Sequence, residues 1–188
     1  MNKIRTFLSL NFDSAVKDKA SEILRVQRES FRDYLIKWEK SEKFHLTLRF
    51  LGDIDEKQAE LLSYQLDNIA FSFDKIAYVT NGIGFFPNAR RPNVIFIGLE
   101  EEGNNSGELV NKIDAVISEI GIKPDKKFVA HITLGRFRRE NRKGAEGVNI
   151  ESFEPFRVEF NSFFLMKSVL DYRGSEYFPI KEFNFKKN

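Results

Sequence analysis

Hydrophobic residues follow two different spacings along this chain, one typical of helices and one typical of strands. Three segments repeat apolar residues every three or four positions, as amphipathic helices do. They are a segment that begins near Asp13 or Ser14 with a stripe from Val16 to Leu35, and the segments Asp55–Asn68 and Asn105–Glu119. Asp13 suits an N-cap and Gly121 follows the last helical position, so the ends agree with separate helices.

Other runs are rich in Phe, Val, Ile and Thr and predict strands. They are Ile4–Asn11, Phe44–Phe50, Lys75–Phe85, Asn93–Leu99, Phe128–Phe137, Phe156–Phe160 and Phe163–Leu170. Because strands outnumber helices, we expect an α+β fold with mostly antiparallel sheets. A chain of 188 residues suits one compact unit, so we expect residues 1–188 to form a single bilobal domain.

One short pattern occurs twice. His45-Leu-Thr-Leu and His131-Ile-Thr-Leu are separated by nearly half of the chain, and each follows a predicted helix that itself follows a strand. Repetition at this scale predicts a duplicated fold in which two equivalent strands face each other across a central groove. The first lobe then carries the His45 motif and the second the His131 motif, and the terminal strands are free to cross between lobes.

The repeated motif places chemistry on one face of each strand. Alternate residues of a strand share a face, so His45 lies with Thr47 and His131 with Thr133, opposite the apolar residues between them. A neutral imidazole can deprotonate an attacking water or hydroxyl while a protonated one donates to a departing ribose oxygen. Threonine hydroxyls can hold the non-bridging phosphate oxygens. A lone strand histidine is usually structural, but two in matching frames favour acid and base catalysis at a phosphodiester.

Two arginines lie beside the motifs. Arg49 is four residues after His45 and should share its face, whereas Arg136 is five residues after His131 and should not. Gly135 offers a solution, because a glycine inside a strand often marks a bulge that re-aims the next side chain. We therefore predict a bulge or a strand end at Gly135.

Composition excludes several kinds of chemistry. The chain has no cysteine, which rules out disulfides, thiolate nucleophiles and cysteine-bound zinc and fits a cytoplasmic location. Neither motif has a carboxylate at metal-ligand spacing, and nothing resembles a Walker loop or an adenylating lysine motif. We expect no metal and no cofactor. The apolar stretch from Thr6 to Phe12 is too short to span a membrane and reads as the first strand.

A net charge of +2 does not identify a nucleic-acid binder, so the evidence for one has to come from local clusters of Lys and Arg. The basic residues after the second motif, which give an RNA backbone an electrostatic path, are Arg136, Arg138, Arg139, Arg142 and Lys143. A solvated loop explains the outer members equally well. Arg90 and Arg91 form a second candidate patch, and the aromatic residues placed to stack a terminal base are Phe50, Phe86 and Phe137.

The two motifs in their extended form resemble a known family. His45-Leu-Thr-Leu-Arg-Phe-Leu-Gly52 and His131-Ile-Thr-Leu-Gly-Arg136 are similar to the motifs of the two-histidine phosphoesterase superfamily, in its RNA 2′,3′-cyclic phosphodiesterase or 2′-5′ RNA ligase branch. The further matches, from about residue 4 to residue 178, are Arg5-Thr-Phe-Leu-Ser-Leu, Trp38, Phe86-Pro and Arg91-Pro-Asn-Val-Ile-Phe-Ile-Gly-Leu99. Ala130 departs from the family pattern, in which proline is common there.

The resemblance implies two antiparallel sheets that form a concave groove with helices outside. It also implies hydrolysis of a terminal 2′,3′-cyclic phosphate of RNA to a 2′-phosphate, with His45 as general acid to the leaving 3′ oxygen and His131 as base for water. Thr47, Thr133 and Arg136 would hold the phosphate. The further candidates for substrate contact are Arg49, Phe50, Phe86, Arg138 and Arg139.

Other functions fit the same residues. By microscopic reversibility the acid and base also serve a 2′-5′ RNA ligase, and the substrate could be a 2′-5′ oligonucleotide or a small cyclic nucleotide. A non-catalytic RNA-end-binding module is the alternative from a different class, and the intact His and Thr of both motifs argue against it. The sequence indicates no membrane contact and no obligate protein partner.

Overall fold

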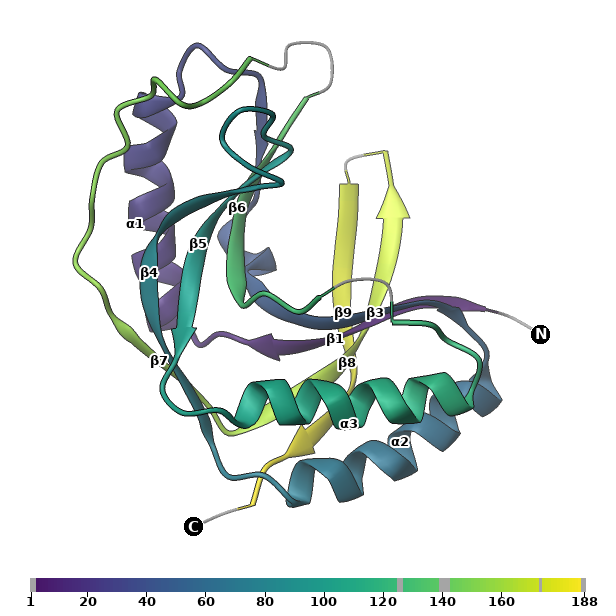
Figure 1. The fold of residues 1–188 in the computed structure, drawn as a ribbon. Coiled ribbons are helices and arrows are strands. Elements are labelled where there is room, and N and C mark those ends of the chain that lie inside the picture. The colour runs from purple at the N-terminus through teal and green to yellow at the C-terminus, as the bar shows by residue number, and fades with distance from the viewer. Residues whose placement is uncertain (1–2, 125–126, 139–142, 173, 187–188) are drawn as a thin grey trace.

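The computed structural model describes residues 3–124, 127–138, 143–172 and 174–186. Two antiparallel sheets form the centre and the helices lie outside them (Figure 1), which confirms the predicted α+β class. Within these ranges, no helix combines the length and the apolar character that crossing a membrane requires.

The first sheet, called the His45 sheet after the histidine on its edge strand, joins the two ends of the chain. Its strands in spatial order are β3 (His45–Ile54), β1 (Ile4–Asn11), β8 (Ser162–Asp171) and β9 (Gly174–Asn184). All neighbouring strands are antiparallel. Among the described strands only β1 pairs with β3, which makes β3 an edge strand of this sheet.

The second sheet, called the His131 sheet, has five strands. In spatial order they are β2 (Ile36–Trp38), β6 (His131–Phe137), β5 (Val94–Glu101), β4 (Ile76–Phe86) and β7 (Arg157–Phe160). Strand β6 is paired on both sides, by β2 and β5. The two histidine strands, β3 and β6, also contact each other, so the sheets meet where the motifs lie.

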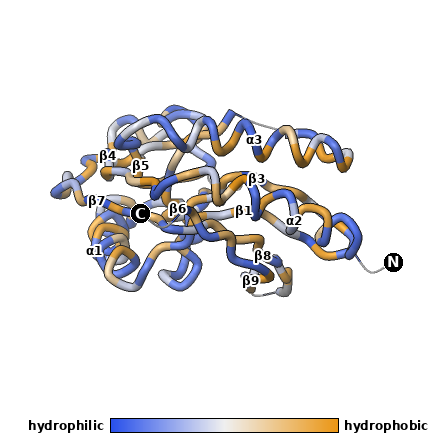
Figure 2. The backbone as a smooth tube through the Cα atoms, turned by 90° about the horizontal axis from the view of Figure 1, so that it is seen from below, coloured by the Kyte–Doolittle hydropathy of each residue, from blue (hydrophilic) through white to orange (hydrophobic). Residues whose placement is uncertain are grey.

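The helices cover the outer faces in a crossed arrangement. They are α1 (Ser14–Ser30), α2 (Glu56–Phe71) and α3 (Asn105–Glu119). Helix α1 follows a strand of the His45 sheet but lies beside the His131 sheet, whereas α3 follows a strand of the His131 sheet and lies with α2 against the His45 sheet (Figure 1). Hydrophobic and hydrophilic residues alternate along α2 and α3 (Figure 2), as expected for helices with one buried face.

Local chemistry explains where the helices begin. The Asp13 carboxylate accepts a hydrogen bond from the Val16 amide at 2.8 Å. Asp55 and Gln58 form a reciprocal capping box before α2. Buried leucines and isoleucines of the helices and the sheets then form one core, in which each fully buried side chain contributes about 1.5–3 kcal/mol.

Three expectations about element boundaries were wrong. The first helix ends at Ser30, so Leu35 lies beyond it and is 49% exposed; residues 36–38 instead pair with β6 as β2. The strand expected from Phe128 begins only at His131. Strand β9 was not predicted, because nearly all of its residues are exposed or half-buried and Pro179 interrupts it, so its sequence lacks a strand-like apolar pattern.

Candidate active site

Both histidine strands carry the same irregularity. In the β1–β3 ladder Ser9 lies opposite Thr47 and Leu8 opposite Arg49, so Leu48 has no partner. In the β5–β6 ladder Phe96 lies opposite Thr133 and Ile95 opposite Gly135, which leaves Leu134 without a partner. Each strand therefore bulges at the third residue after its histidine, and the bulge predicted at Gly135 is confirmed.

The bulges decide which side chains reach the groove. After each one the face alternation is shifted by one residue, so the fifth residue after each histidine returns to the histidine's face. In β6 this residue is Arg136, and in β3 it is Phe50, which is 57% exposed. The sequence argument for Arg136 therefore holds, and Phe50 occupies the equivalent place on the other strand.

The same shift corrects the expectation for Arg49. This residue is 8% exposed and its guanidinium binds the carboxylate of Asp114 on α3. It lies on the helix-covered side of the sheet, so it does not share the face of His45. The reason is the bulge at Leu48, which the spacing rule for a regular strand does not include.

Hydrogen bonds fix the imidazole of His45. Because a carbonyl oxygen can only accept, His45 Nδ1–H donates to the main-chain oxygen of Lys43 at 2.7 Å. In the neutral ring Nε2 is then the acceptor, and the Thr47 hydroxyl donates to it at 3.0 Å. Nε2 is therefore the nitrogen that can exchange a proton with substrate.

His131 is held in the same way. Its Nδ1–H donates to the main-chain oxygen of Val129 at 2.7 Å. As with His45, the acceptor is two residues before the histidine, which leaves Nε2 as the proton-exchanging nitrogen. Matching local structure thus gives both imidazoles the same tautomer and the same reactive atom.

Both imidazoles have pKa values below that of an ordinary histidine. Burial, aided by the nearby positive charges of His131, Arg136 and Lys17, lowers the pKa of His45 to about 4. Burial also lowers the pKa of His131, with Arg136 adding to the effect. In the absence of substrate both rings are therefore neutral at pH 7.

Aromatic rings surround each histidine. Phe7 and Tyr177 lie with their centroids 5.0 and 5.3 Å from that of His45. Phe86 and Phe96 lie 4.9 and 5.3 Å from His131 and stack on each other at 4.2 Å. These rings exclude water from the imidazoles, which explains the lowered pKa values.

Arg136 is oriented but accessible. Its guanidinium lies 3.7 Å from the Glu39 carboxylate, and its side chain is 56% exposed. The ion pair is long, so an incoming phosphate can share the guanidinium at little cost.

Among the other candidates for substrate contact, Phe86 ends β4 beside His131. Arg138 is exposed at the end of β6, and Arg139 lies outside the described residues.

Several residues near the site were not expected from the sequence. Phe7 and Tyr177 lack a motif, and only the sheet brings them to His45. Lys37 lies beside Arg136 in the β2–β6 ladder. A Cβ built on Gly174 would lie 3.0 Å from the Nζ of Lys37 and 4.0 Å from the Nζ of Lys43. Two ammonium groups thus gather at the tip of the β8–β9 hairpin. No sequence signal identifies them, because the hairpin folds back from the far end of the chain.

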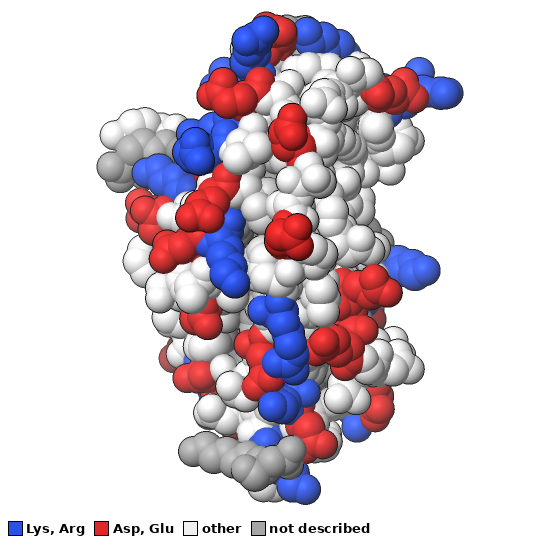
Figure 3. All heavy atoms as spheres, turned by 90° about the vertical axis from the view of Figure 1, so that its left-hand side faces the viewer, with Lys and Arg blue, Asp and Glu red and all other residues white. Residues whose placement is uncertain are grey.

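Charge elsewhere is mixed. On the α1 side of the molecule, Lys and Arg side chains are interspersed with Asp and Glu (Figure 3). Arg90 lies 3.5 Å from the Glu146 carboxylate, and both side chains are largely exposed. In the described ranges, no group of three or more histidines and carboxylates is placed to hold a metal ion.

Comparisons with known proteins agree with this geometry, which is that of a two-histidine phosphoesterase. The family model described as LigT-like phosphoesterase matches the chain twice, over residues 11–96 and 97–177. The chain therefore belongs to the LigT-like phosphoesterase family. The double match divides the chain between the two histidine motifs, which confirms the predicted duplication.

Relatives cover the whole length. The RNA 2′,3′-cyclic phosphodiesterase of Archaeoglobus fulgidus is 32% identical over 181 residues, 96% of this chain and 99% of the relative. That of Methanocaldococcus jannaschii is 32% identical over 95% of this chain and 99% of its own length. The structure of Escherichia coli LigT with 3′-AMP has the same fold, with a TM-score of 0.78 at 20% identity over 99% of this chain and 100% of that one.

Proposed function

We propose that this protein is an RNA 2′,3′-cyclic phosphodiesterase, a phosphoric diester hydrolase that opens a terminal cyclic phosphate to a 2′-phosphate. One observation carries the proposal. Each imidazole donates Nδ1–H to the carbonyl two residues before it, which leaves Nε2 to exchange protons in the groove. The relatives named for this activity, which match nearly the whole chain, support it.

The reaction needs one base and one acid. His131 Nε2 takes a proton from water as the water oxygen attacks phosphorus, and the bond between phosphorus and the 3′ oxygen breaks. His45 Nε2 gives its proton to that 3′ oxygen, which leaves a 3′ hydroxyl and a 2′-phosphate. The two histidines end in exchanged protonation states, and proton exchange with solvent restores them.

Substrate binding supplies the proton on His45. Both imidazoles are neutral at pH 7 in the free protein because burial lowers their pKa values. A bound cyclic phosphate carries a negative charge, which favours the protonated form of an adjacent imidazole. The acid therefore forms when substrate is present.

The phosphate is held by residues around the two rings. Thr47 donates to His45 Nε2 in the free protein, and its hydroxyl can turn to a non-bridging oxygen once Nε2 is protonated. Thr133 lies two residues after His131 on the same face, and Arg136 follows it beyond the bulge. Their positive and donor groups stabilise the charge that develops as the ring opens.

The whole chain takes part as one bilobal unit in this proposal. Strand β2, from the first half, flanks the second histidine strand, and β8 and β9 from the end of the chain complete the His45 sheet. The basic groups of Lys37 and Lys43 at the hairpin tip suit the backbone of an RNA strand. An RNA end is therefore the proposed substrate.

The test is metal-free turnover with product analysis. An RNA oligonucleotide ending in a 2′,3′-cyclic phosphate is incubated with the protein in EDTA, and the phosphate position in the product is read by phosphorus NMR. We expect a 2′-phosphate, and a loss of about 10²–10⁴ in rate for His45→Asn and for His131→Asn. A need for added metal, or activity that survives both substitutions, contradicts the mechanism. Tight RNA binding without turnover would instead identify a binding module.

A further inference from the structure

The bulge in β3 lacks the support that the bulge in β6 has. Strand β6 is held from both sides, and a Cβ on Gly135 would lie 2.7 Å from Ile36 and 3.1 Å from Trp38 of β2. Among the described strands, β3 pairs only with β1. A bulge breaks the ladder locally, so any constraint on this one from its other side comes from outside the sheet.

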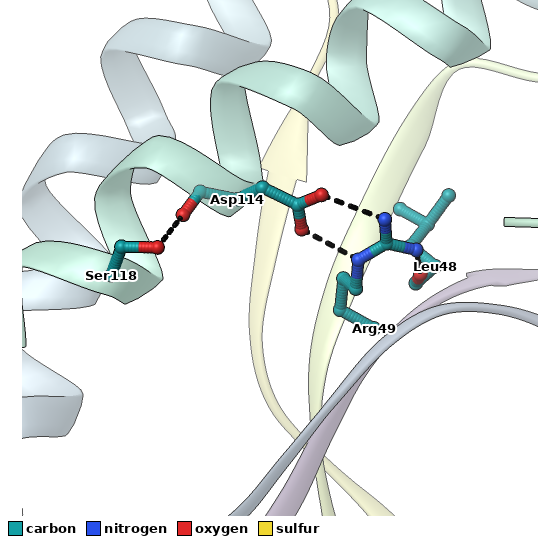
Figure 4. A network of polar contacts seen from close by, with 4 residues as sticks. All are labelled: Leu48, Arg49, Asp114 and Ser118. Atoms are coloured by element: carbon teal, nitrogen blue, oxygen red, sulfur yellow. Dashed lines mark hydrogen bonds and ion pairs between the residues drawn. The ribbon is translucent and has the colours of Figure 1, made fainter. Parts of the chain in front are cut away.

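Arg49 and Asp114 supply that constraint. Arg49 Nε and Nη2 donate to the two carboxylate oxygens of Asp114 at 2.5 and 2.7 Å (Figure 4). The third nitrogen, Nη1, donates at 3.0 Å to the main-chain oxygen of Leu48, the bulged residue itself. The guanidinium thus binds the main chain at the bulge itself.

The geometry of this contact is specific. A bidentate arginine–carboxylate pair fixes the plane of the guanidinium, and the arginine side chain is only 9% exposed. Lysine has a single charged nitrogen and cannot bind both carboxylate oxygens and Leu48 in this planar arrangement. Asp114 lies on α3, the helix that precedes the His131 strand in the chain. The contact therefore ties the first motif to the second half of the molecule.

We propose that Arg49 and Asp114 are positioning residues that fix the β3 bulge and thereby aim Thr47 and Phe50 at the substrate. The inference rests on the proposed function, because its catalytic effect is measured on that reaction. Thr47 immediately precedes the bulge and holds His45 Nε2, while Phe50 follows it. Without the Arg49–Asp114 contact, called the clamp, β3 relaxes toward regular strand alternation. This change turns Phe50 away from the groove and displaces Thr47.

A buried ion pair could also serve stability alone, so a second, more exposed ion pair of the same sheet serves as the comparison. Lys181 of β9 lies 2.5 Å from Asp67 of α2, so this pair also joins a helix to an edge strand of the His45 sheet. The β3 bulge and His45 make no contact with it. Because an exposed ion pair contributes little to stability, Lys181→Met should lower the melting temperature only slightly and leave kcat within about twofold.

The experiment compares Arg49→Lys, Arg49→Met and Asp114→Asn with Lys181→Met. We expect kcat for the cyclic-phosphate RNA end to fall about 10–100-fold in Arg49→Met, as for a small displacement of a catalytic group. Arg49→Lys should recover only part of this loss, since it keeps the charge without the fork. The NMR titration of His45 should move in the Arg49 and Asp114 variants and stay in place in Lys181→Met.

Two results would contradict the positioning role of Arg49 and Asp114. One is an unchanged kcat and an unchanged His45 titration in folded Arg49→Met or, if that variant does not fold, in Asp114→Asn. The other is a loss of kcat in Lys181→Met as large as in the Arg49 variants. If the unmodified protein does not turn over the cyclic phosphate, the proposed function fails. The positioning role is then tested by the His45 titration alone, which should move in the Arg49 and Asp114 variants.

Discussion

Phe50 and Arg136 occupy equivalent positions on the two histidine strands, each the fifth residue after its histidine and each turned to the histidine's face by a bulge. The two positions differ in chemistry. Arg136 offers a cation for the phosphate, whereas Phe50 offers an exposed aromatic face. In the proposed mechanism the duplicated groove is thus divided, with Arg136 toward the phosphate on the His131 side and Phe50 toward a base on the His45 side.

This division predicts a binding role for Phe50. Stacking of a base on an aromatic ring contributes about 1–3 kcal/mol. Phe50→Leu should therefore raise KM for a cyclic-phosphate RNA end about tenfold and change kcat little. The control is Phe71→Leu, which replaces a 69% exposed phenylalanine at the end of α2. Equal KM values for the two variants would refute stacking on Phe50.

Gly135 is predicted to be required for the placement of Arg136. A Cβ there would meet Ile36 and Trp38 closer than ordinary van der Waals contact, so alanine must push β2 away from β6. We expect Gly135→Ala to destabilise the protein by about 1–3 kcal/mol in urea unfolding and to lower kcat/KM.

The control for Gly135→Ala is the same substitution at Gly147, where an added Cβ would have no atom within 4 Å. Gly147→Ala should leave both stability and turnover near the values of the unmodified protein. An equal effect of the two substitutions would mean that contact between β2 and β6 does not set the position of Arg136.

The sequence was sufficient for residues whose role depends on local pattern. His45, His131 and their threonines are set by strand alternation, and the glycine at 135 identified the bulge that brings Arg136 to the same face. These features repeat, so each motif served as a check on the other.

The sequence pattern did not predict the position of residues that is set by contacts between distant segments. Arg49 was placed on the wrong face because its bulge has no glycine to signal it, and its partner Asp114 comes from the distant helix α3. Tyr177 reaches His45 because β9 returns to the His45 sheet from the far end of the chain. No local spacing encodes either contact.

Burial of His45 predicts a specific loss of stability in acid. The pKa of His45 is about 4 in the folded protein, against 6.5 for an exposed histidine. Between these values the unfolded chain binds a proton that the folded protein does not, so stability is complete above pH 6.5 and falls as the pH drops toward 4. Urea unfolding at pH 7.5 and pH 5 measures this loss.

His45→Asn removes the titrating group, so its loss of stability between pH 7.5 and pH 5 should be smaller than that of the unmodified protein. Carboxylates contribute equally to both proteins and cancel in the difference. The prediction fails if the two proteins lose the same free energy of unfolding over this range.

Lys37 and Lys43 are predicted to bind the RNA strand next to the reacting phosphate. Their ammonium groups lie together at the hairpin tip, and Lys37 is beside Arg136 in the β2–β6 ladder. The double variant Lys37→Gln/Lys43→Gln should raise KM for an oligonucleotide with a cyclic-phosphate end and leave KM for a cyclic mononucleotide unchanged. Each lost phosphate contact should also reduce the slope of log affinity against log salt by about 0.7.

The comparison variant is Lys57→Gln/Lys186→Gln, which removes the same charge from exposed positions outside the groove. If long-range charge alone attracts RNA, both double variants will weaken oligonucleotide binding equally. A direct contact predicts that only the Lys37 and Lys43 pair changes KM, because a surface charge beyond about 8–10 Å is screened at physiological salt. Equal KM changes for oligonucleotide and mononucleotide would place both lysines at the reacting phosphate instead of along the strand.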